Sequence, residues 1–261
     1  PIEVAAGALG LRMTDELIKT DPVRGTPWDQ QAGRKGPAET SSLWDRNTRT
    51  LRLRAAQNET LGFVFSFTRK KDEFPALEFR IQDFKGPKNV ISGKHLKLFQ
   101  TRYSRAGSSP QDAEWLGDVL VPLRDKLSLD NAPRGQRAQS VYAELHVPAK
   151  AEKGTYHGQI SLVSGNGSES RLNVVLDVLP IRMPDQPRFA IELPVPFAIA
   201  QLYKKDIAKV AEAAPIERAY QQIASDHRCT LAFVPYARNG VWPTQVVPTT
   251  AGKGADLSVP T

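Results

Sequence analysis

Apolar and polar residues alternate along much of the chain between positions 50 and 180. Leu51, Leu53 and Ala55 alternate with Arg52 and Arg54. The same period of two recurs at positions 61–67, 77–81, 96–98, 141–147, 156–162 and 172–178. Successive side chains of a β-strand point to opposite faces of its sheet, so each segment predicts a strand with one buried and one solvent-facing side.

The number and spacing of these strands constrain the fold class. With a further segment at 115–123, we expect seven or eight short strands between positions 43 and 180 and no helix among them. The polar turn at 164–168 contains two glycines and predicts a hairpin between the last two strands. Such a set must form two packed sheets or a barrel, so the sequence predicts a mainly β protein built on an antiparallel β-sandwich.

The pattern changes after Pro180, Pro184 and Pro187, which mark a stiff linker. Short apolar strands are expected at 189–193 and 230–234, with helical spacing at 206–213 and 215–226 between them. Pro215 suits the first turn of the second helix, where its missing N–H costs nothing. This order predicts the opening βαβ portion of an incomplete (β/α) barrel, because the remaining residues are too few for a barrel of about 250.

The chain therefore divides into four expected parts. They are an extended lead-in at 1–40, a β-sandwich domain at 41–182, a linker at 183–188 and a partial α/β segment at 189–261. Within the lead-in, Thr14 to Lys19 predicts one or two helical turns capped by Thr14.

Composition and charge narrow the class of protein. With 40% hydrophobic and 24% charged residues the chain is typical of a globular protein, and no run reaches the roughly 18 apolar residues of a membrane span. The net charge of +7 makes nucleic acid a candidate partner. However, the basic excess is spread thinly, and the densest cluster, at 69–71, is followed at once by Asp72 and Glu73. We therefore expect neither a nucleic-acid partner nor a membrane span.

The N-terminus and the cysteine content bear on compartment. The chain opens at Pro1 without a charged and apolar leader, so we expect an export signal to have been removed or never to have been present. Cys229 is the only cysteine and cannot form an internal disulfide. We expect a secreted or periplasmic bacterial protein, with a cytoplasmic location as the alternative.

Several motifs resemble those of a known family. They are RAAQNETLGF at 54–63, WLGDVLVPL at 115–123, Val147-Pro148 and GTYHG at 154–158. Their order and spacing resemble the N-terminal β-sandwich of family 123 glycoside hydrolases and of their uncharacterised relatives. Leu179-Pro180 and ASDHR at 224–228 are similar to the entry to the catalytic barrel of that family. The resemblance implies a protein that acts on a glycan, with N-acetylhexosamine units as one option.

Cleavage of a glycosidic bond needs a carboxylic acid and a second carboxylate, or the acetamido oxygen of the substrate held by an acidic side chain. Beyond position 189 the acidic residues are scattered, and they include Glu192, Glu212, Glu217, Asp226 and Asp256. The resemblance implies that the catalytic pair lies on later barrel strands. We therefore expect a non-catalytic N-terminal portion, inactive alone, whose catalytic carboxylates lie beyond residue 261 and whose remaining barrel is a candidate partner chain.

Four residues are candidates for contact with a sugar. Glu192 is expected near the C-terminal end of a strand, where barrel enzymes place their functional residues. Tyr236 and Trp242 follow the second apolar strand, and Trp115 opens a loop-like segment; each ring could stack on a pyranose or simply pack. A salt-bridge or turn role is the alternative for Glu192. We expect no cofactor and no metal site, since the four histidines lie in separate elements.

Two rival functions remain open. The first is a carbohydrate-binding or structural β-sandwich module without enzymatic activity. The second, motivated by charge alone, is a β protein that binds nucleic acid.

Overall fold

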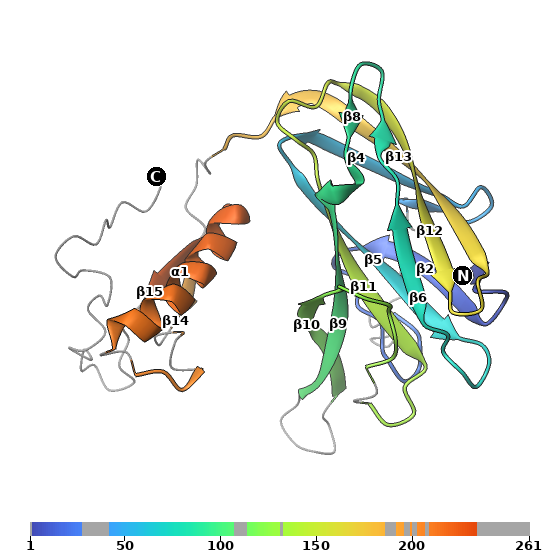
Figure 1. Ribbon diagram of the computed structural model, residues 1–261, viewed down its shortest axis with the longest axis horizontal. Coiled ribbons are helices and arrows are strands. Elements are labelled where there is room, and N and C mark those ends of the chain that lie inside the picture. Colours follow the sequence, from blue (N-terminus) through green and yellow to red (C-terminus); the bar gives the residue numbers. More distant parts are fainter. Residues whose placement is uncertain are drawn as a thin grey trace. The chain divides into compact units, whose positions relative to one another are not determined.

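A computed structural model describes residues 2–27, 42–106, 114–130, 133–185, 192–195, 199, 203–206 and 209–233. For Glu192–Val195, Val210 and Thr230–Phe233 it describes the backbone alone. The chain divides into two compact units, 1–183 and 184–261, and each is described by itself. The first unit is a mainly β sandwich of two sheets, as predicted (Figure 1).

The first sheet has six strands in the order β1-β2-β5-β11-β9-β10, and every neighbouring pair is antiparallel. In that order the strands are β1 (Ile2–Val4), β2 (Leu9–Asp15), β5 (Thr60–Arg69), β11 (Ala138–His146), β9 (Leu96–Ala106) and β10 (Glu114–Pro122). The expected segment at 115–123 is thus an edge strand of this sheet.

The second sheet runs in the order β3-β4-β13-β12-β7-β8, and β6 also pairs with β12. The strands are β3 (Trp44–Asp45), β4 (Thr50–Gln57), β13 (Glu169–Arg182), β12 (Gly154–Ser164), β7 (Phe84–Lys85), β8 (Val90–Ile91) and β6 (Leu77–Ile81). β4 and β13 are parallel, so the expectation of purely antiparallel strands is wrong at this pair. Parallel neighbours need a long crossover, and most of the sandwich lies between these two strands in sequence.

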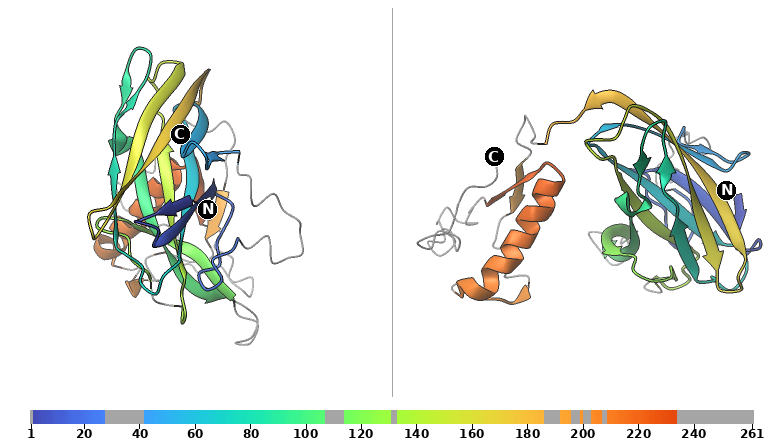
Figure 2. Two further views of the ribbon diagram at one scale, coloured as in Figure 1. Left: turned by 90° about the vertical axis from the view of Figure 1, so that its right-hand side faces the viewer. Right: turned by 45° about the horizontal axis from the view of Figure 1, so that its top comes forward.

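The core lies between the two sheets and follows the predicted alternation. Phe63, Phe65 and Phe67 of β5 are buried, and so are the alternate residues of β11, β12 and β13. Phe65 and Phe79 pack edge to face with ring centroids 5.5 Å apart, an arrangement favoured by aromatic rings. Figure 2 shows the same unit from two further directions.

Residues before position 16 belong to the sandwich. β1 and β2 join the first sheet through the pairing of Leu11 with Phe67 and of Met13 with Phe65. The predicted helical turns beginning at Thr14 are wrong, because Thr14 lies in β2 opposite Val64. A six-residue helix cannot offset its nucleation cost, whereas Leu9, Leu11 and Met13 bury their side chains by extending the sheet. The sandwich therefore uses residues that the sequence pattern assigned to a lead-in.

The second unit contains two parallel strands joined through a helix. β14 (Glu192–Val195) pairs in parallel with β15 (Thr230–Phe233), and α1 (Val210–Asp226) lies between them in sequence, as the predicted βαβ order requires. The expectation of two helices is wrong, because one helix begins at Val210, within the first predicted segment, and continues through the second to Asp226 with Pro215 inside it. Pro215 lacks the N–H that would donate to the Ala211 oxygen, so the helix loses that backbone hydrogen bond. No described helix is long and apolar enough to cross a membrane.

Candidate functional site

The structure places two of the four predicted site residues. Trp115 lies on β10 opposite Arg105 of β9, and the Arg105 guanidinium carbon is 5.8 Å from the centre of the indole ring. This is a cation–π distance, and it leaves the indole partly exposed. Glu192 opens β14, which runs on to Val195, so its expected place at the C-terminal end of a strand is wrong. Tyr236 and Trp242 lie outside the described residues.

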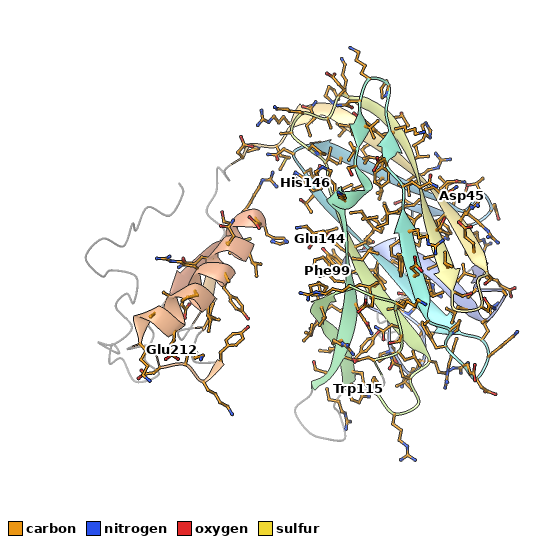
Figure 3. All side chains as sticks on the ribbon, in the orientation of Figure 1. Asp45, Phe99, Trp115, Glu144, His146 and Glu212 are labelled. Carbon is orange, nitrogen blue, oxygen red and sulfur yellow. The ribbon has the colours of Figure 1, made fainter. Side chains whose placement is uncertain are left out.

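Trp115 belongs to the face of the first sheet that points away from the core, named here the outer face. Pairing in register puts Tyr142 of β11 beside Phe99 of β9 on this face, with ring centroids 6.3 Å apart. Figure 3 shows His146, Glu144, Phe99 and Trp115 along one side of the sandwich. Side chains two residues apart on a strand share a face, so the outer face combines aromatic rings with ionisable groups.

A small cavity of about 180 Å³ is sunk into the outer face and is named here the outer-face pocket. Its walls come from residues 16–20 and from β5, β9, β10 and β11. The hydroxyl of Tyr142 and the carboxylate of Glu16 lie at this pocket, and neither has a hydrogen-bond partner among the described residues. Val64 and Leu120 contribute apolar wall. The pocket therefore offers hydrogen-bonding groups beside apolar surface.

A chain of hydroxyl groups connects the strands at the pocket. The Thr20 and Ser66 hydroxyl oxygens are 2.8 Å apart, and those of Ser66 and Ser140 are 3.3 Å apart. The Ser140 N–H donates to the Tyr103 hydroxyl oxygen at 3.1 Å. The Tyr103 N–H in turn donates to Asp130, whose carboxylate also binds Arg102. Buried polar groups that are satisfied in this way hold the wall of the pocket in one arrangement.

Both tyrosines at the pocket are neutral at physiological pH. Burial raises the pKa of Tyr103 to about 12. Burial, together with the nearby carboxylates of Glu144 and Glu16, raises the pKa of Tyr142 to about 12. A neutral phenol both donates and accepts a hydrogen bond, so Tyr142 can bind a hydroxyl or amide of a ligand in either direction.

Two glycines keep the pocket open. A Cβ at Gly62 would overlap the Glu16 carboxylate and lie 2.6 Å from the Tyr142 hydroxyl oxygen. A Cβ at Gly117 would lie 2.6 Å from the Thr101 methyl carbon. A side chain at either position would displace these groups, so glycine preserves the shape of the pocket.

An ion pair between distant parts of the sequence lies at the rim of the pocket. Lys19 binds Asp118, and about half of each side chain is exposed. The register of β10 shifts between Gly117 and Val119, which leaves Asp118 in a β-bulge. A β-bulge changes the direction in which a side chain points, and this bulge places Asp118 beside Lys19.

Four carboxyl groups outside the outer-face pocket have a lowered pKa. Wherever a carboxyl pKa is shifted it is lowered: at Glu3 by Lys70, at Asp45 by hydrogen bonds from Thr48 and Asn47, at Glu78 by Arg80 and at Glu169 by Arg171. A general acid needs a raised pKa. Among the described residues, no three His, Cys, Asp or Glu side chains gather as metal ligands. The hydrogen-bonding groups and apolar wall of the outer-face pocket are suited to binding a polar ligand.

Sequence reasoning found one edge of this site and missed the rest. The predicted segment at 115–123 contains Trp115, Gly117 and Asp118. Glu16 and Lys19 were missed because they follow a strand that the pattern did not reveal. Ser140 and Tyr142 lie on the polar side of a predicted strand, which periodicity assigns to solvent. A tyrosine flanked by serine and glutamate on that side was the available signal.

Comparison with known proteins finds a similarity of fold. No family model and no curated protein matches the chain. The N-terminal domain of PorA matches with a TM-score of 0.28 at 11% identity over 51% of this chain and 90% of that one. A FixG-related protein from Vibrio parahaemolyticus matches with a TM-score of 0.25 at 8% identity over 66% and 96%. TM-scores this low support no conclusion about this chain.

One solved structure matches much more extensively. It is a family 123 glycoside hydrolase from Clostridium perfringens, with a TM-score of 0.63 and 15% identity. The match covers 85% of this chain and 37% of that one, so the chain spans little more than a third of the length of the Clostridium protein. At this identity the likeness shows the fold alone. The chain is similar in fold to part of a family 123 glycoside hydrolase.

Proposed function

We propose that the chain is the non-catalytic portion of a glycoside hydrolase-like protein, and that its outer-face pocket and Trp115 contact the glycan. The observation that carries the proposal is the extent of the match with the Clostridium perfringens structure. The matched 85% of the chain exceeds the 183 residues of the first unit, so it includes part of the second unit. A sandwich matched alone would be a weaker argument, because sandwiches serve many functions.

The chemistry of the outer face fits a saccharide. A sugar ring presents hydroxyl groups at its edge and C–H groups on its faces. Glu16, Ser140 and Tyr142 of the pocket can bind the sugar hydroxyl groups, and the apolar wall can contact the C–H groups. Its volume of about 180 Å³ is below the roughly 300 Å³ of typical small-molecule sites, so it holds a single sugar unit at most. Trp115 lies two residues from Gly117 and extends the surface beyond the pocket.

In this proposal the catalytic carboxylates are not among the described residues. The lowered pKa values at Glu3, Asp45, Glu78 and Glu169 favour ionised groups, which cannot protonate a leaving oxygen. The Clostridium protein is an enzyme of glycolipid glycan hydrolysis. The family resemblance of the sequence motifs adds N-acetylhexosamine, and we propose a glycan that contains it as the ligand of this chain.

A second candidate function is a carbohydrate-binding or structural module with no enzymatic parent. The outer-face pocket supports it, since hydrogen-bonding groups beside an apolar wall can bind a sugar without catalysis. A carbohydrate-binding module would share the glycan contact at the outer face with the first candidate, whereas a structural module would bind no glycan.

The test is a binding and hydrolysis assay on the full chain. We expect N-acetylhexosamine oligosaccharides to bind in isothermal titration calorimetry and nitrophenyl N-acetylhexosaminides to remain intact. Tyr142→Phe and Trp115→Ala should each weaken binding by about tenfold, which corresponds to about 1.4 kcal/mol. Val90→Ala, an exposed apolar residue of the second sheet, is the matched control and should bind as the unmodified chain does.

Three results would contradict the proposal. Hydrolysis by the chain alone would refute a non-catalytic role. Glycan binding that survives both outer-face substitutions would place the contact elsewhere. Retention on DNA that falls steeply with salt, without any glycan binding, would favour the nucleic-acid alternative.

A further inference from the structure

A second and larger cavity, of about 1130 Å³, lies where β6 of the second sheet and β9 of the first sheet approach each other. We name it the intersheet groove. Phe79 and Ile81 of β6 line one side, and Leu96 and Leu98 of β9 line the other. Phe79, Ile81 and Leu98 pack against the core but are only partly buried. The groove is thus an opening in the side of the sandwich through which core side chains are reached.

Backbone contacts of β6 with other segments flank the groove on both sides. At one end, the Leu123 N–H donates to the Leu98 oxygen at 2.9 Å, and Leu127 pairs with Leu77. At the other end, a Cβ on Gly93 would lie 3.0 Å from the Ile81 and Gln82 carbonyl oxygens. Between these ends only positions 78–81 of β6 are available. Four residues of strand span on the order of 13 Å, so the groove accommodates a short extended segment.

The backbone of β6 is available on this side. The Leu77 N–H donates to the Leu127 oxygen at 3.0 Å, and the Leu77 oxygen accepts from the Leu127 N–H at 2.7 Å, so the polar groups of Leu77 point away from β12. Backbone direction alternates along a strand, so the N–H and C=O of Phe79 point to the same side. Among the described residues, nothing pairs with Phe79 there. An unpaired strand edge is a template for another strand.

The rim of the groove carries an excess of positive charge. Lys97, Arg124 and Lys126 line it, and none of them forms an ion pair with a described residue. Two carboxylates, Glu78 and Asp125, line the groove beside these three cations; Arg80 binds Glu78 at 2.8 Å, and Glu144 of β11 lies opposite Lys97. The charge therefore favours an occupant with acidic groups.

We propose that the intersheet groove binds an extended, acidic peptide segment of a partner protein, which adds to β6 as a further strand. Alternate apolar side chains of the segment enter the groove between Phe79 and Leu98. Its backbone pairs with Phe79, and its acidic side chains meet Lys97, Arg124 and Lys126. Strand addition of this kind draws affinity from main-chain hydrogen bonds and specificity from alternate side chains. A hydrocarbon chain would fit the apolar surface but would leave the N–H and C=O of Phe79 without a partner.

The test uses the full chain and labelled synthetic hexapeptides in fluorescence anisotropy. The probe alternates valine or leucine with glutamate. Two matched peptides carry either lysine for glutamate or N-methyl groups on the amides that face β6. We expect the acidic probe to bind and both matched peptides to bind at least about tenfold more weakly, because one loses the charge and the other the backbone donors.

Substitutions at the rim of the groove test the role of charge without disturbing the fold. Arg124→Glu and Lys126→Glu alter exposed side chains and should reverse the preference, so that the lysine peptide binds better than the acidic one. Lys150→Glu, an exposed lysine that does not line the groove, is the control and should change nothing. In hydrogen exchange, the Phe79 amide should become protected only when the acidic probe is present.

Three outcomes would overturn the proposal. The first is failure of the acidic probe to bind at its solubility limit. The second is equal affinity for the N-methylated peptide, which would exclude strand addition. The third is binding of an anionic detergent without any peptide binding, which would make the groove an amphiphile site. None of these outcomes bears on glycan binding at the outer face.

Discussion

The two faces of the first sheet are built from the same strands yet have opposite properties. On β5 and β11, Phe65 and Val141 point inward and are fully buried, whereas Ser66 and Ser140 point outward and join a chain of hydroxyls. Phe65 pairs with Val141, and Ser66 with Ser140, so the contrast arises between consecutive residues. The comparison teaches that one face supplies the free energy of folding while the other can specialise for binding. Each prediction below tests that separation.

The largest expected effect is on the inner face. Phe65→Ala should lower the free energy of unfolding by about 3–5 kcal/mol, because it opens a cavity in a packed core that cannot collapse around it. Urea denaturation followed by fluorescence measures the change, with Val90→Ala as an exposed control. A loss below about 1 kcal/mol would show that the inner face does not dominate stability.

The second effect concerns a buried tyrosine of the outer face. Tyr103 has a pKa of about 12 in the folded chain and about 10 when unfolded. The unfolded state therefore loses its phenolic proton first, so stability holds below pH 10 and falls as the pH rises towards 12, by about 2–3 kcal/mol for this group. Denaturation at a series of pH values measures the fall. Tyr103→Phe should remove this part of the dependence of the unfolding free energy on pH. An unchanged pH dependence would contradict the raised pKa of Tyr103.

A third substitution should separate binding from stability on the outer face. Gly62→Ala places a methyl group against Glu16 and Tyr142 at the pocket. The added carbon also lies 3.0 Å from the Glu16 Cβ, but Glu16 is exposed and can move aside, so we expect stability to change by no more than about 1 kcal/mol while glycan affinity falls by about tenfold. Calorimetry and urea denaturation on the same sample measure both. Parallel losses in the two would show that this part of the outer face is structural.

The smallest effect is expected at the rim. Asp118→Asn breaks the ion pair with Lys19, which is half exposed and therefore contributes only about 0.2–1 kcal/mol. Thermal denaturation at low and at high salt should show a small difference that disappears at high salt. Arg171→Gln, which breaks another exposed pair on the second sheet, is the control. A loss above about 2 kcal/mol would make the rim part of the folding core.

The strands that sequence reasoning predicted correctly are those whose burial has a period of two. Leu61 to Phe67 and Val141 to Val147 are clear examples, and the structure confirms both. The errors have local causes. Thr14 looks like a helix cap when its strand partner is unknown, and Pro215 looks like a helix start when a longer helix tolerates it. Of the candidate site, the prediction included Trp115 but neither Tyr142 nor Glu16.

The sequence by itself determined the mainly β character of the first unit, the face that each strand buries and the strand–helix–strand order of the second unit. Those properties depend on residues that are close together in the sequence, so the order of apolar and polar residues is enough to predict them. Only the tertiary structure decided that Lys19 meets Asp118, that β4 lies parallel to β13 and that an opening remains between β6 and β9. Backbone hydrogen bonds between strands are alike for nearly every residue, so the choice of partner across a hundred positions is made by packing of the whole molecule.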